Sequence, residues 1–101
     1  MTDPLRAVFM VVAPGSDPQQ HTQQLETPVL QLKIVAVKDY DQAVEVTRQC
    51  VAQGYSVIEL CAGFGQQGVA RVSQAAGSIP VGVVRFDHHP LMGHISGDSL
   101  F

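Results

Sequence analysis

Side chains that could carry chemistry gather in two short segments, 59–68 and 85–89, which read ELCAGFGQQG and RFDHH. Each segment begins with a charged residue inside an otherwise apolar run. A carboxylate or an imidazole can move a proton, a thiol can act as a nucleophile, and a guanidinium can hold a carboxylate. The candidate catalytic residues are therefore Glu59, Cys61, Arg85 and His89.

The charged residues Glu59 and Arg85 fall in consecutive predicted strands. If those strands are neighbours, alternation of side chains places Glu59 and Cys61 on one face with Arg85 and Asp87. A buried carboxylate needs a partner, and a guanidinium is a good one, so we predict an ion pair between Glu59 and Arg85. The pair could bind a substrate, or it could only fix the register of the two strands.

A glycine-rich turn, Gly63-Phe64-Gly65-Gln66-Gln67-Gly68, matches the pattern G-x-G-x-x-G between a predicted strand and a predicted helix. Backbone N–H groups at such a helix N-terminus can hold a phosphate or another anion. The chain is too short for the second half of a dinucleotide-binding domain, so we expect no bound cofactor. The alternative is a tight turn that needs the backbone freedom of glycine.

The C-terminal segment contains histidines that could in principle bind a metal ion. Its histidines His88, His89 and His94 lie near Asp87 and Asp98, but H-H-P-x-x-x-H is not a known spacing for one metal ion. We favour solvated or capping histidines, with His89 as a possible general acid or base, and predict no metal site.

The two cysteines lie within apolar segments. Cys61 could be a nucleophile if the following helix N-terminus stabilised its thiolate, although a small buried apolar role is favoured. Cys50 lies on the apolar stripe of a predicted helix and is expected in the core. Two cysteines inside apolar segments and without metal-type spacing fit a reducing cytoplasm.

The elements that must position these residues follow from hydrophobic periodicity and turn signals. Apolar, β-branched runs predict strands, and apolar residues at helical spacing between cap signals predict helices. The polar stretch 16–27 is predicted as a loop and 88–101 as an irregular tail. The expected strands are 6–13, 31–38, 55–62 and 79–87, and the expected helices are 39–53 and 66–76.

Short β-α-β connections predict right-handed crossovers, and so parallel strands from the second strand onward. The fold class is thus α/β: a single domain over residues 1–101, with a four-stranded, mainly parallel sheet, two crossover helices and an irregular tail. A ferredoxin-like α+β arrangement is the alternative. Parallel strands this apolar need cover on both faces, and two helices cannot supply it. We therefore expect a homodimer or a larger homo-oligomer.

The composition of the chain limits the classes of partner and location that it can have. The 101 residues are 46% hydrophobic and only 15% charged, with a net charge of −3 and a pI of about 5.7. A chain this acidic has no basic face for nucleic acid as its main partner. No apolar run is long enough to cross a membrane, and the first residues lack the features of a signal peptide.

Three stretches together resemble a known family: VAP with Asp17-Pro18 and His21, IELCAGFG, and VGVVRFD with His89-Pro90 and Ser96-Gly97-Asp98. The chain resembles, over nearly its whole length, the small bacterial family called domain of unknown function 6506. The resemblance implies a compact, cytoplasmic bacterial protein, and it implies no particular activity.

The leading functional hypothesis is a domain that binds a small molecule or an anion at the C-terminal edge of the third and fourth predicted strands. A small isomerase or lyase that acts on a carboxylate-bearing metabolite is the first alternative, and a structural or partner-binding subunit is the second. The predicted ligand-binding residues are Gly63, Phe64, Gly65, Arg85, Asp87 and His89.

Overall fold

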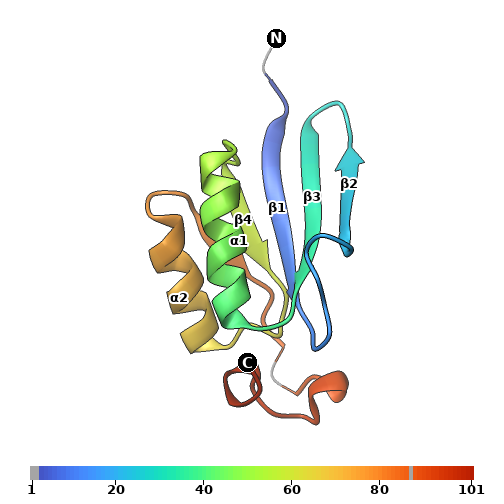
Figure 1. The fold of residues 1–101 in the computed structure, drawn as a ribbon, viewed down its shortest axis with the longest axis vertical. Helices are drawn as coiled ribbons and strands as arrows, with labels where there is room; N and C mark the ends of the chain where they lie inside the picture. The colour runs from blue at the N-terminus through green and yellow to red at the C-terminus, as the bar shows by residue number, and fades with distance from the viewer. Residues whose placement is uncertain (1–2, 87) are drawn as a thin grey trace.

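A computed structural model describes residues 3–86 and 88–101. It has a five-stranded mixed sheet in the order β2-β3-β1-β4-β5, with two α-helices (Figure 1). The strands are β1 (Leu5–Val12), β2 (Thr22–Glu26), β3 (Leu30–Val37), β4 (Val57–Leu60) and β5 (Val81–Val83), and the helices are α1 (Tyr40–Ala52) and α2 (Gln66–Ala76). The α/β class predicted from the sequence is confirmed.

Both helices cover the same face of this sheet. The chain passes from β3 through α1 to β4, and then through α2 to β5, so it moves across the sheet in one direction. Right-handed crossovers that move in one direction place their helices on one side. Within residues 3–86 and 88–101, no helix covers the opposite face of the sheet.

The core lies between the sheet and the two helices. Alternate side chains of β1, β3 and β4, such as Met10, Val37 and Leu60, are fully buried there. From α1, Ala43 and Cys50 reach the same cluster, and α2 supplies Val72. Burial raises the pKa of the Cys50 thiol, which is 0% exposed, and this agrees with its predicted place in the core.

The prediction of four mainly parallel strands is wrong in one respect. The polar segment Thr22–Glu26, predicted as a loop, forms β2 and pairs antiparallel with β3 through a short turn at 27–30. The sequence TQQLE has no apolar alternation, because an edge strand needs no buried face of its own and is protected by polar side chains. β5 is also much shorter than the predicted strand 79–87.

The helix boundaries follow the predicted signals. Asp39 caps α1, and its Oδ1 accepts a hydrogen bond of 2.9 Å from the backbone N–H of Gln42. α2 ends at Gly77, whose φ of +68° is open to glycine but strained for other residues. None of the helices among the described residues combines the length and apolar character that a membrane span requires.

The tail after β5 crosses the C-terminal ends of the strands (Figure 1, lower part). It contains two short 3₁₀ turns, Pro90–Met92 and Gly97–Ser99. Ligand sites of parallel α/β sheets lie at these strand ends. The tail therefore lies beside the expected site, and it determines which groups remain accessible there.

Candidate functional site

The N-terminus of α2 is capped by a carboxylate from the tail. Asp98 Oδ2 accepts a hydrogen bond from the N–H of Gln67 at 3.0 Å, and its Oδ1 accepts one from Gly68 at 3.2 Å. The N-cap residue, Gly65, has no side chain to do this. A negative charge at this end of a helix is favourable, so Asp98 takes the position that an external anion would occupy.

Tyr40, the first residue of α1, connects this cap to the glycine turn. Its hydroxyl accepts the N–H of Gly65 at 3.0 Å and has both Asp98 Oδ1, at 3.0 Å, and the Gly63 carbonyl, at 3.1 Å, as acceptors for its single proton. Burial, together with the nearby charge of Asp98, raises the pKa of Tyr40 to about 12. The phenol therefore stays protonated as a donor at ordinary pH.

The glycines of the turn are needed for space and not for unusual dihedral angles. None of Gly63, Gly65 and Gly68 has a positive φ. A Cβ at Gly65 would lie 2.4 Å from the Asp98 carboxyl carbon, and one at Gly68 would lie 2.5 Å from the Tyr40 ring. The G-x-G-x-x-G pattern thus marks three close approaches, by Val12 at Gly63, by Asp98 at Gly65 and by Tyr40 at Gly68.

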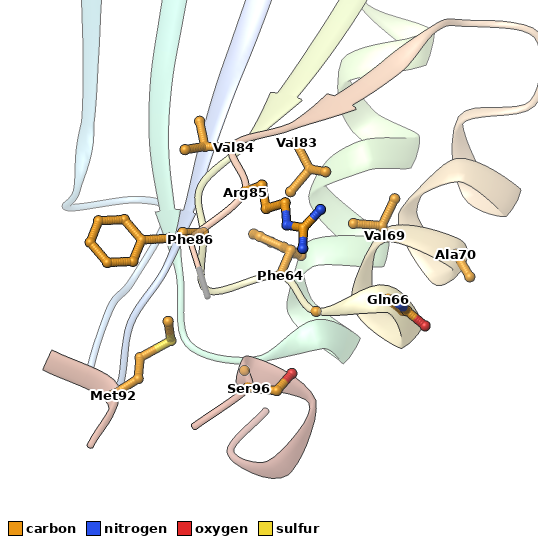
Figure 2. Close-up of a pocket in the computed structure, with 13 residues that line it drawn as sticks. Phe64, Gln66, Val69, Ala70, Val83, Val84, Arg85, Phe86, Met92 and Ser96 are labelled. Atoms are coloured by element: carbon orange, nitrogen blue, oxygen red, sulfur yellow. The ribbon is translucent and has the colours of Figure 1, made fainter. Parts of the chain in front are cut away.

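The larger cavity, of about 610 Å³, lies between the start of α2, the end of β5 and the tail (Figure 2). Arg85 extends its guanidinium toward Phe64 and Val69, whereas Phe86 points to the other side. Arg85 is the sole charged residue among the described residues that line the cavity. The remaining lining is mostly apolar: Ala62, Phe64, Gly65, Gln66, Val69, Ala70, Val83, Val84, Phe86, Met92, Ser96 and Gly97.

A second cavity, of about 350 Å³, lies on the other side of the glycine turn, beside the ends of β1 and β4. Cys61 and His89 both line it. The Cys61 sulfur accepts the N–H groups of Val12 and Gly63, each at 3.4 Å. His89 Nδ1 accepts the N–H of Leu91 at 3.1 Å, so its Nε2 carries the proton of the neutral ring.

The structure therefore divides the predicted site. Phe64, Gly65 and Arg85 meet in the larger cavity, and Cys61, Gly63 and His89 meet in the smaller one. Asp87 lies outside the described residues. The four candidate catalytic residues do not form one constellation.

The prediction that Glu59 and Arg85 share a face is wrong. Glu59 pairs in register with Gly82, on the face away from the helices, and it is exposed. Arg85 lies two residues beyond the end of β5 and enters the cavity on the helix side. The error lies in the register: Glu59 stands opposite Gly82, so Val83 lies on the other face, and Arg85 lines the cavity together with Val83.

Two of the tail histidines, His89 and His94, have a ring nitrogen within hydrogen-bond distance of the backbone. His94 Nδ1 lies 3.3 Å from the carbonyl oxygen of His88, while Asp98 is engaged at α2. Among residues 3–86 and 88–101, no three His, Cys, Asp or Glu side chains lie close enough to hold a metal ion.

Two residues that organise the site, Tyr40 and Asp98, are not among the ligand-binding or catalytic residues that the sequence predicts. The helical spacing places Tyr40 on the buried stripe of its helix, and Asp98 lies 30 residues beyond Gly68, whose N–H it accepts. The triplet Ser96-Gly97-Asp98 was the available signal. A Cβ at Gly97 would lie 1.7 Å from the Gly63 carbonyl oxygen, so this glycine lets the tail approach the turn.

Fold and site together define a small α/β domain with one covered sheet face and a tail that closes over the strand ends. The chain belongs to the family of unknown function DUF6506, whose model matches residues 5–99. The suspected family resemblance is therefore confirmed. Neither a curated protein nor a solved structure matches the chain.

Proposed function

We propose that this protein binds a small organic anion with an apolar body in the cavity beside Arg85. The observation that carries the proposal is one guanidinium within a mainly apolar lining. Ligand sites are commonly apolar concavities with a few polar groups that fix orientation. A guanidinium recognises a carboxylate by two parallel hydrogen bonds, so a carboxylate is the favoured anion.

The position of Asp98 distinguishes between organic and inorganic anions as ligands. A bare anion such as inorganic phosphate would need the α2 amides, and Asp98 already accepts two of them. An organic anion can leave this cap intact, because its charge goes to Arg85 and its apolar part lies along Phe64 and Val69. The proposal therefore favours hydrophobic carboxylates over inorganic anions.

The isomerase or lyase alternative is less well supported by the same geometry. Its proposed base, Glu59, lies on the opposite face of the sheet from Arg85, and His89 lines the other cavity. A base must lie within hydrogen-bond reach of the proton that it removes. Binding without catalysis needs only the cavity and Arg85.

The test is calorimetric titration with hexanoate and, as a neutral analogue, hexanamide. We expect saturable binding of hexanoate and at least about tenfold weaker binding of the amide, since a charge-assisted pair is lost. Arg85→Gln should abolish this preference. Arg48→Gln, which removes an exposed arginine of α1 outside the cavity, is the matched control. Equal binding of both compounds, or a preference that survives Arg85→Gln, would refute the proposal.

A further inference from the structure

The face of the sheet that the helices leave uncovered is strongly apolar. Leu5 is 49% exposed and Leu25 is 50% exposed, and Phe9, Leu32, Ile34 and Val57 are each partly exposed beside them. The registers of β1, β2, β3 and β4 place all six on this side. We call it the open face.

A sheet whose central strands are parallel is normally covered on both sides. Here the crossovers have placed both helices on one side of the sheet. The described part of the tail lies at the C-terminal ends of the strands. Glu59 is the one charged residue on the open face among the described strand residues. Such a surface is typical of an interface core, where charged residues are depleted.

The size of the open face suits a second copy of the chain. With about 3.3 Å per residue along a strand and about 4.8 Å between strands, its flat projection is roughly 450 Å². Protruding side chains enlarge the accessible area beyond this projection. Two such faces would bury about 1,000 Å² or more, which reaches the lower limit for specific interfaces.

One row of side chains across the open face fixes how two copies would meet. Gln23 pairs with Ile34, Ile34 with Phe9, and Phe9 with Glu59, each in neighbouring strands. The row thus runs from a neutral amide through two large apolar side chains to a carboxylate. Its two ends are complementary in hydrogen bonding, because the amide donates and the carboxylate accepts.

We propose that the open face is the interface of a homodimer whose two-fold axis runs along the strands between β3 and β1. This axis brings Ile34 of one copy against Phe9 of the other and Glu59 over the other copy's Gln23. An axis across the strands would instead bring β4 over β4 and place the two Glu59 carboxylates near each other, which is unfavourable. Sheets packed in this way remain aligned within about 30°.

The first test is sedimentation equilibrium of the full chain across the micromolar range. We expect a concentration-dependent dimer of the 10.8 kDa chain. Leu25→Glu should raise the dissociation constant at least about tenfold, because it buries an unpaired charge. Leu25 is half exposed, so the monomer should still fold. Leu91→Glu, at a site in the tail that is 91% exposed, should leave association unchanged.

The second test addresses the axis. Gln23→Lys should strengthen association and Gln23→Glu should weaken it, because each new charge would face Glu59 of the other copy. Gln24→Lys and Gln24→Glu, on the opposite face of the same strand, are the controls and should change nothing. A monomer at every concentration, an unaffected Leu25→Glu variant, or Gln23 effects that do not depend on the sign of the charge would each overturn the proposal.

Discussion

The N-termini of the two helices are capped by aspartates that lie at very different distances along the chain. At α1 the cap is local, since Asp39 bonds to Gln42 three residues further along the chain. At α2 it is distant, since Asp98 bonds to Gln67 and Gly68 about 30 residues before it. Both helices gain the same chemistry, a carboxylate on free amides. Only the second cap also attaches a tail and closes one side of a cavity.

The largest effect in this comparison is expected at Gly97, where the tail meets the turn. An alanine Cβ would overlap the Gly63 carbonyl oxygen, so Gly97→Ala should separate the tail from α2 and cost about 2–3 kcal/mol. Urea denaturation measures this change. Gly82→Ala, where no atom lies within 4 Å of the added Cβ, should stay within about 0.5 kcal/mol. Equal effects at both positions would show that the close approach is not stabilising.

Substituting each capping aspartate by alanine should distinguish the local cap of α1 from the distant cap of α2. Asp98→Ala and Asp39→Ala should each cost about 1–2 kcal/mol, the usual range for a lost N-cap. Hydrogen exchange should then differ between them. Asp98→Ala should speed exchange at Gln67, Gly68 and in the tail, whereas Asp39→Ala should affect only the start of α1. Unchanged exchange in the tail of the Asp98 variant would show that Asp98 does not attach the tail to α2.

The distant cap should also respond to alkaline pH through Tyr40. Its pKa is about 12 in the folded protein and 10.0 in the unfolded chain, so the folded state holds its proton more tightly. The contribution to stability is complete below pH 10 and is lost as the pH rises toward 12. The measurement is the difference in stability between the native chain and Tyr40→Phe, which isolates the contribution of this phenol. The variant should show the shallower decline, and identical slopes would contradict the assignment.

The smallest effect is expected where the two helices meet at the surface. Arg71 of α2 forms an ion pair with Asp41 of α1, and both side chains are substantially exposed, at 44% and 84%. An exposed pair contributes little, so Asp41→Asn should change the free energy of unfolding by less than about 0.5 kcal/mol. A thermal melt checks this. A loss as large as that of Asp98→Ala would mean that the helix contact, and not the tail, holds α2 in place.

The sequence was sufficient to predict a structural feature wherever the contact that determines this feature is local. Neighbouring residues predict the capping of α1 by Asp39 and the end of α2 at Gly77. They also predict the buried strands. β2 was missed because an edge strand is stabilised by pairing with β3 and carries no apolar pattern. Asp98 was missed because nothing in the tail indicates which helix it will reach, and the turn glycines were therefore interpreted as an anion site.

In the ligand-bound protein we expect the tail carboxylate to hold the α2 amides while Arg85 receives the ligand's charge. The most direct measurement is a two-dimensional hydrogen–nitrogen NMR titration with hexanoate that follows the Arg85 Nε–H and the amides of Gln67 and Gly68. We expect saturable shifts at Arg85, Phe64 and Val69 while Gln67, Gly68 and Asp98 stay unchanged. Shifts at Gln67 and Gly68, with displacement of Asp98 and an unmoved Arg85, would instead show that the anion binds at the α2 amides.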